Sequence, residues 1–350
     1  MWIYWTLFLW PAFFAVVDPR LSASLTKLTV LLFAIFLTLI IGLRFEVGVD
    51  WINYLYHLEF AKNSNWYDAA QSKDIAYGLL NWVAVSNDYG VWLVNFVCAI
   101  VFVSGFFVFC RKLPNPWLAL TVGIPYIAIV MGMNYTRQSA AFGFELLALV
   151  ALQDGRIRRF VILIIIASSF HKSAMILLPI AALISARNRF WTVFWVSVAS
   201  ALSFIMFIGE AYEGLVSSYA GVELASGGAL IRVVMNAVAA VVFLAMRSHI
   251  VLPPLQMKIW TVVSIIALLF IPALALSPSS TAVDRLALYF MPIQLLVFSH
   301  LPSAVRQWGW RSVATLLLVI GYALIMFVWF NYSQYSLSWL PYKFYPLEVL

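Results

Sequence analysis

Apolar runs of roughly 15–20 residues recur along this chain, and this pattern restricts its fold more than any other feature. Such a run is long enough for an α-helix to cross a bilayer and too long for a membrane β-strand. The chain is 64% hydrophobic and only 10% charged, whereas a soluble domain carries about 25% charged residues. The sequence therefore predicts an all-α polytopic membrane protein.

We expect one transmembrane helical domain over residues 1–350 with about twelve helices, some of them short or re-entrant. The predicted spans are Trp2–Val17, Leu28–Leu43, Val91–Phe109, Trp117–Met133, Gln138–Leu152, Phe160–Phe170, Ser173–Ala186, Phe190–Ile208, Leu230–Met246, Ile259–Leu276, Leu286–Phe298 and Val313–Phe330. Polar loops at 44–89 and 210–229 interrupt them. The apolar piece Ile75–Val85 is too short to cross and predicts a surface or re-entrant helix.

The charges divide unevenly between alternate loops. One set of loops holds thirteen Lys and Arg residues against two acids, Asp18 and Asp154, although the whole chain has only 21 Lys and Arg. Cytoplasmic loops carry such an excess of cations, so this set is expected inside. The net charge of +7 then reflects topology and does not indicate nucleic-acid binding. The candidate site residues fall on the opposite, outer side.

The first candidate site follows the second span, where Arg44 and Asp50 flank Gly48. A planar guanidinium suits phosphate oxygens because it donates two parallel hydrogen bonds, and a carboxylate suits a sugar hydroxyl. Ionisable groups at membrane depth are functional candidates by default. The alternative is a structural ion pair at a helix end. Tyr54, in the same segment, is a further substrate-binding candidate.

Three more segments place a cation at the end of an apolar run. Arg137, with Tyr135 and Gln138 beside it, opens the span at 138–152, where free helix N–H groups would also attract an anion. The alternative for this arginine is snorkelling to the membrane interface. Arg232 heads a later span, and a cation at a helix N-terminus indicates an anionic ligand or partner. The third segment holds Arg285 beside Asp284, and this aspartate is the competing partner for Arg285.

His171 and Lys172 occupy the expected tip of a hairpin formed by Phe160–Phe170 and Ser173–Ala186. A histidine can exchange protons near neutral pH, so His171 is a candidate general base, against the alternative of a satisfied core residue. No cluster with metal-ligand spacing is found in the sequence, and we expect neither a metal nor a cofactor.

Taken in order, several motifs resemble the EpsG family, relatives of Wzy-type bacterial polysaccharide polymerases. They are R-F-x-V-G-x-D-W-x-x-Y (44–54), Y-G-L-L-N (77–81), N-Y-T-R-Q-S-x-A (134–141), S-F-H-K-S-A-M-I-L-L-P (169–179), D-R-L-A-L-Y-F (284–290) and W-L-P-Y-K (339–343). They span nearly the whole chain. Trp51 departs from the family, which often has Tyr there.

The resemblance implies an enzyme of the bacterial inner membrane with a fold like the membrane-embedded GT-C glycosyltransferases. Such proteins join undecaprenyl-diphosphate-linked oligosaccharides at the periplasmic face to build exopolysaccharide or O-antigen. Their partners are the lipid-linked substrate, the bilayer and a chain-length regulator.

For this chemistry we predict that Arg44, Arg137 and Arg285 stabilise the leaving diphosphate, and Arg232 is a further candidate for the same role. His171 is the preferred catalytic base, and Asp50 orients the acceptor or acts in its place. Two other classes remain open: a transporter or flippase of lipid-linked oligosaccharides, and a membrane O-acyltransferase. The aromatic residues Trp339, Tyr342 and Tyr345 are expected to form an interfacial belt.

Overall fold

The computed structural model describes residues 1–17, 22–184, 228–277, 279–305 and 308–348, with the single positions 194, 197, 198 and 201. These residues are almost entirely helical. Their elements, in order, are α1 (Trp2–Val17), α2 (Ala23–Gly42), β1 (Arg44–Phe45), α3 (Trp51–Lys62), α4 (Trp66–Ala70), α5 (Ile75–Ser86), α6 (Gly90–Cys110), α7 (Pro116–Gly123), η1 (Ile124–Gly132), α8 (Thr136–Gln153), α9 (Ile157–Phe170), η2 (Lys172–Leu177), α10 (Leu178–Ile184), α12 (Ala229–Met246), α13 (Pro254–Leu276), α14 (Ser280–Ala287), η3 (Leu288–Phe290), α15 (Pro292–Ala304), α16 (Trp308–Tyr332), η4 (Ser336–Trp339), β2 (Lys343–Phe344) and α17 (Tyr345–Glu348).

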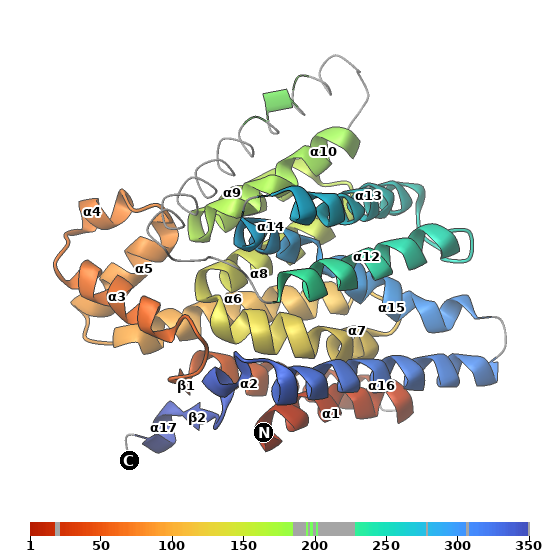
Figure 1. Cartoon of the computed structure of the whole chain (residues 1–350), viewed down its shortest axis with the longest axis horizontal. Coiled ribbons are helices and arrows are strands. Elements are labelled where there is room, and N and C mark those ends of the chain that lie inside the picture. Colours follow the sequence, from red (N-terminus) through yellow and green to blue (C-terminus); the bar gives the residue numbers. More distant parts are fainter. Residues whose placement is uncertain are drawn as a thin grey trace.

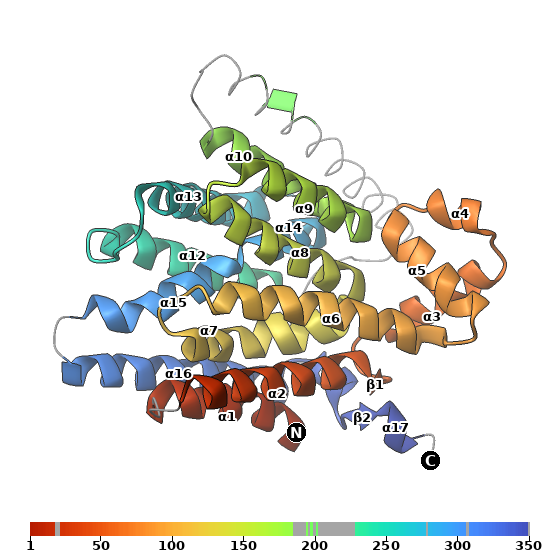
Figure 2. The same cartoon turned by 180° about the vertical axis from the view of Figure 1, so that it is seen from behind.

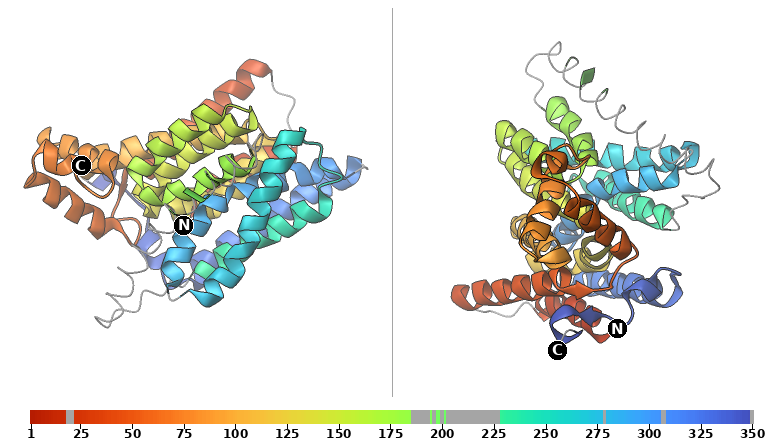
Figure 3. Two further views of the ribbon diagram at one scale, coloured as in Figure 1. Left: turned by 90° about the horizontal axis from the view of Figure 1, so that it is seen from above. Right: turned by 90° about the vertical axis from the view of Figure 1, so that its left-hand side faces the viewer.

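The long helices lie side by side in one bundle, with α1, α2 and α16 along one edge and α9, α10 and α13 along the other (Figures 1 and 2). Helices α7 and α8 lie between these edges, and the largest cluster of buried apolar side chains includes residues from both. In the right-hand view of Figure 3, which looks along the bundle, the first edge lies at the bottom and the second at the top.

Five helices of the described residues are long and apolar enough to cross a membrane. The pair Ser280–Phe290 and Pro292–Ala304, bent by 42°, would be a sixth span if counted as one. The expected class, an all-α polytopic membrane protein, is therefore confirmed, but the expected total of about twelve spans is not. Several other apolar helices are shorter than a full span, and the predicted span 190–208 lies almost wholly outside the described residues.

Helices α6 and α8 approach each other closely at two glycines. A Cβ atom on Gly105 would lie 2.0 Å from the carbonyl oxygen of Gly143, and one on Gly143 would lie 2.5 Å from that of Val101. In a bilayer, helices associate through such close packing, because lipid tails are as apolar as the side chains that they replace. This contact holds α8, whose first turn carries Arg137 and Gln138.

The chain before α8 forms an unusual helix. Residues of η1 adopt a π-helix that continues α7, and all nine of them are buried. π-Helical turns are rare and occur often at functional sites. The π-helix η1 ends at Gly132, and Asn134 and Tyr135 follow it shortly before α8 begins.

The polar segment between α2 and α6 folds into three short helices, α3, α4 and α5, at one end of the bundle (Figure 1). Helix α5 matches the expected short helix at Ile75–Val85. Helix α4 begins with a capping box, in which the Asn65 side chain accepts from the N–H group of Asp68 and the Asp68 side chain accepts from that of Asn65.

The final segment, residues 333–348, which we call the C-terminal strap, ties distant parts of the chain together. Its strand β2 pairs with β1. The Trp339 carbonyl accepts a hydrogen bond from Tyr4 Oη (2.6 Å), and Tyr342 Oη donates to the Ile40 carbonyl (2.8 Å). Trp339 is only 2% exposed, so its expected place in an interfacial belt is wrong.

Candidate functional site

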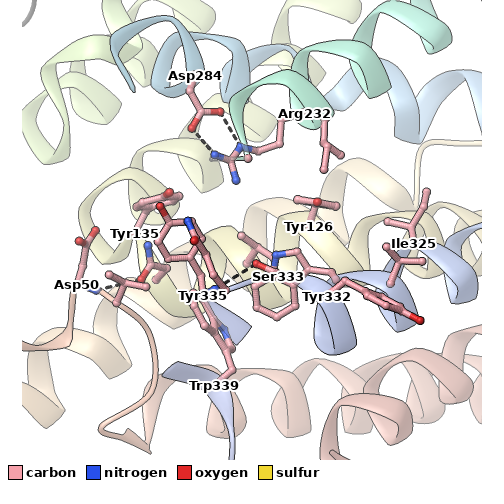
Figure 4. A pocket seen from close by; sticks show the side chains of 18 of the residues that line it. Asp50, Tyr126, Tyr135, Arg232, Asp284, Ile325, Tyr332, Ser333, Tyr335 and Trp339 are labelled. Atoms are coloured by element: carbon pink, nitrogen blue, oxygen red, sulfur yellow. Dashed lines mark hydrogen bonds and ion pairs between the residues drawn. The ribbon is translucent and has the colours of Figure 1, made fainter. Parts of the chain in front are cut away.

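A cavity of about 760 Å³ lies between η1, α12, α14, α16 and the C-terminal strap, and we call it the main cavity. Figure 4 shows Asp50 at one end, the Arg232–Asp284 pair above, and aromatic rings of α16 and the strap below. Its lining residues are Val49, Asp50, Tyr126, Val130, Asn134, Tyr135, Gly228, Ile231, Arg232, Thr281, Asp284, Arg285, Leu324, Ile325, Val328, Trp329, Tyr332, Ser333, Gln334, Tyr335 and Trp339.

The loop before α3 carries Asp50 into the main cavity. Gly48 has a φ of +100°, a conformation that favours glycine, and a Cβ atom there would lie 2.9 Å from the Met133 carbonyl oxygen. Its N–H group donates to the Ser338 carbonyl of the strap (2.8 Å). The N–H group of Asp50 donates to Asn134 Oδ1 (3.0 Å). The glycine in the motif of residues 44–54 is thus what lets this loop lie against the turn before α8.

The pKa of the Asp50 carboxyl differs from that of an ordinary aspartate. Burial raises its pKa above the ordinary value, while the charge of Arg285, a hydrogen bond from Asn53 and the charge of Arg137 oppose the rise. The Asn53 Nδ2 group donates to Asp50 Oδ1 at 3.3 Å. A carboxylate with a raised pKa is a better proton acceptor than an ordinary aspartate.

The two arginines of the main cavity differ in their partners. Arg232 and Asp284 are both buried and form a two-pronged ion pair, in which Arg232 Nε lies 2.6 Å from Asp284 Oδ1 and Nη2 contacts Oδ2. Asp284 is therefore the partner of Arg232 and not, as the sequence suggested, of its neighbour. Among the described residues, the Arg285 guanidinium has no hydrogen bond or ion pair, whereas the Arg285 backbone carbonyl accepts a hydrogen bond from Gln138 Nε2 (2.6 Å).

Arg44 lies outside the main cavity and is 1% exposed. Its guanidinium donates to the Ile41 carbonyl (2.6 Å), Thr136 Oγ1 (2.7 Å) and Asn95 Oδ1 (3.4 Å). It thereby joins the end of α2 to α6 and α8.

Tyr54 makes a similar connection to the start of α8. Its hydroxyl donates to the Asn134 carbonyl (2.9 Å) and accepts from the N–H group of Thr136 (2.8 Å). Arg44 and Tyr54 thus hold the turn that presents Asn134 to the main cavity.

A second cluster gathers around Asp74, a residue that the sequence analysis missed. Its carboxylate accepts from Arg137 Nη1 (2.8 Å) and from the N–H group of Lys172 (3.1 Å), and His171 Nδ1 lies 3.7 Å away. Burial tends to raise the pKa of Asp74, but His171, Arg137 and the Lys172 N–H group lower it below its usual value. The only sequence signal was an acid directly before a short apolar helix.

The structure thus separates the predicted site residues into two groups. Asp50, Tyr135, Arg232 and Arg285 line the main cavity. Arg44, Tyr54, Arg137, Gln138, His171 and Lys172 do not line it, although they hold or adjoin its walls. The three arginines expected to meet in one cavity therefore do not: only Arg285 reaches it. Within the described residues, no group of three or more His, Cys, Asp or Glu side chains could hold a metal ion.

The opposite wall of the main cavity is apolar and open. Ile231 of α12 and Leu324, Val328 and Tyr332 of α16 line it, yet they are 51, 56, 51 and 78% exposed. Helices α12 and α16 are both long and apolar enough to cross a membrane. The main cavity therefore combines a polar end with a side that opens between two helices of the span type.

These features define a polytopic helical membrane protein with an amphipathic internal cavity. The chain belongs to the EpsG family, whose model matches residues 27–344. Members of this family are Wzy-type polysaccharide polymerases, which are enzymes of the glycosyltransferase type. No curated protein and no solved structure matches the chain, so the expected GT-C-like architecture stays a prediction.

Proposed function

We propose that this protein joins lipid-linked oligosaccharide repeats, carried on undecaprenyl diphosphate, into an exopolysaccharide or O-antigen chain, and that the main cavity binds the donor. The observation that carries the proposal is a combination of two features of the main cavity. At one end lie the half-buried Asp50 and Arg285, whose guanidinium has no partner among the described residues, and the other side, at α12 and α16, is apolar and open. A diphosphate needs cations, and an isoprenoid chain needs apolar surface that is continuous with the bilayer.

The proposed reaction is a displacement at the anomeric carbon of the donor sugar. The oxygen of an acceptor hydroxyl forms the new bond to this carbon, and the bond from the same carbon to the diphosphate oxygen breaks. The diphosphate leaves with the electron pair and gains negative charge, so a fixed guanidinium at Arg285 stabilises the transition state more than the ground state. The proton of the acceptor hydroxyl passes to Asp50.

Asp50 is the better candidate for this base than His171, which the sequence analysis preferred. Asp50 lines the main cavity and has a raised pKa, whereas the Nδ1 atom of the buried His171 faces Asp74. In this proposal the Asp74 cluster holds Arg137 close enough for its charge to act on Asp50. Arg44, Tyr54, Gln138 and Lys172 become positioning residues, and Arg232 with Asp284 forms a fixed part of the binding wall.

We place the site on the periplasmic side of a bacterial inner membrane. The support is the uneven division of Lys and Arg between alternate loops, which puts residues 44–89 outside. A polymer made on this side would be available to a partner that regulates chain length.

The test is a joining assay with purified protein in detergent and a defined lipid-linked repeat, scored by the appearance of a two-repeat product. Arg285→Gln should lower turnover about 100- to 1,000-fold, the usual cost of removing one donor from a transition-state oxyanion. Asp50→Asn should lower it about 100-fold or more, because the proton then lacks its acceptor. Arg158→Gln, which removes an exposed cation of α9, is the control and should retain full turnover.

Joining at the wild-type rate by both Arg285→Gln and Asp50→Asn would remove the basis of this assignment. A wild-type protein that moves the lipid-linked repeat across vesicles, but never joins two repeats in detergent, would instead identify a flippase.

A further inference from the structure

One face of α3 is apolar although it is exposed. Ile52, Tyr56 and Phe60 are 60, 69 and 67% exposed, while Trp51 and Tyr54 on the other side are 7 and 4% exposed. The exposed three are spaced by four residues, so they form one row on the helix surface, about 6 Å apart along its axis. A contiguous apolar row in an exposed position marks a binding surface.

Helix α4, the next helix along the chain, carries two more exposed rings. Trp66 and Tyr67 are 60 and 57% exposed, and their ring centroids lie 5.9 Å apart. The capping box of α4 fixes the backbone that carries them. Helices α3 and α4 both pack on α5, so these rings are held on rigid elements rather than on loose loops. We call Ile52, Tyr56, Phe60, Trp66 and Tyr67 the aromatic row.

The aromatic row begins beside the main cavity. Asp50, which lines the cavity, is the residue directly before α3. From there α3 extends outward at the end of the bundle, where α4 and α5 also lie (Figure 1). The row therefore leads from the polar end of the cavity away from the bundle.

We infer that the aromatic row binds the growing saccharide chain as it leaves the main cavity. This inference depends on the proposed function, because it takes the product of that reaction as the ligand. A pyranose ring presents a face of C–H groups that stacks on an aromatic ring, while its hydroxyls stay in water. Large aromatic side chains supply this contact area at low entropic cost. The exposed Glu59 and Lys62 on the same helix suit a hydrated chain better than a lipid interior.

The experiment compares two sets of substitutions in the purified full-length protein. Tyr56→Leu, Phe60→Leu and Trp66→Leu together keep apolar side chains but remove the rings. Tyr56→Phe, Phe60→Tyr and Trp66→Phe together keep a ring at each position. The probe is a set of oligosaccharides of several repeats, cleaved from the lipid of the wild-type product, with binding measured by calorimetry.

The leucine variant should bind these oligosaccharides on the order of tenfold more weakly, since it lacks three ring contacts. In the joining assay it should form the two-repeat product at the wild-type rate but release shorter chains. The ring-retaining variant should match the wild type in both measurements.

Wild-type binding and chain length in the leucine variant would overturn the inference and indicate an apolar contact with a protein or lipid instead. Equal losses in the leucine and the ring-retaining variants would overturn it as well. Failure of the proposed function is recognised separately, because the wild type would then form no two-repeat product.

Discussion

At the scale of single residues, Asp50 is the proton acceptor in the proposed reaction, and its pKa depends on its neighbours. A base accepts a proton only when it is ionised, so activity that depends on Asp50 is present above its pKa and lost as the pH falls through it. The hydrogen bond from Asn53 lowers this pKa against the effect of burial. Removing the hydrogen bond must therefore raise the pKa of Asp50.

The corresponding prediction concerns Asn53→Ala. The acid limb of its pH–rate profile should move to higher pH, while the rate at the plateau stays that of the wild type, because Asn53 is exposed and does not line the main cavity. The measurement is turnover in the joining assay across the acidic range. Asn63→Ala, at the other end of α3, should leave the limb in place. An unmoved limb in Asn53→Ala would argue against Asp50 as the base.

At the scale of helices, the backbones of α6 and α8 approach each other closely at Gly105 and Gly143. Gly143→Ala should destabilise the protein by about 1–3 kcal/mol, because its Cβ atom would meet the backbone of α6 and force the helices apart. The melting temperature in detergent should fall, and the joining rate should fall with it, since the turn at Asn134 leads directly into α8.

Gly321→Ala in α16 is the matched control for this substitution. Apart from its chain neighbours and the nearby backbone of α16 itself, no atom lies within 4 Å of a Cβ placed there. Alanine also has the higher helix propensity, so the melting temperature should stay or rise. Equal melting temperatures for Gly143→Ala and wild type would contradict the close contact.

The element scale also shows what the sequence could predict. Apolar runs located most helices, and the hairpin with its tip at His171 has the expected form, α9 followed by η2 and α10. The span expected from Leu28 begins earlier, at Ala23, because Ser22 caps the helix. The partners of Arg44 and Arg137 could not be predicted, because Thr136, Asn95 and Asp74 come from segments 92, 51 and 63 residues away. Asp50 and Arg285 could be predicted as site residues because each lies next to the end of an apolar run in the sequence.

At the scale of the whole molecule, the proposed orientation can be tested with cysteine labelling. Both native cysteines, Cys98 and Cys110, are buried and should react slowly. Lys62→Cys should react with a membrane-impermeant maleimide in intact spheroplasts. Arg158→Cys should react only after permeabilisation, because it lies in the first turn of α9, in a cation-rich segment that is expected inside. Labelling of both variants from the same side would contradict the proposed topology.

The C-terminal strap has a consequence for how the protein matures. The hydrogen bond between Tyr4 and Trp339 joins residues separated by 335 positions. The N–H group of Gly48 donates to the carbonyl of Ser338, which also lies in the strap. During synthesis, the early helices therefore enter the bilayer long before the loop that carries Asp50 has its support. A nascent chain stalled before the strap would be inserted in the membrane yet inactive, and activity would arise only after the strap has been synthesised.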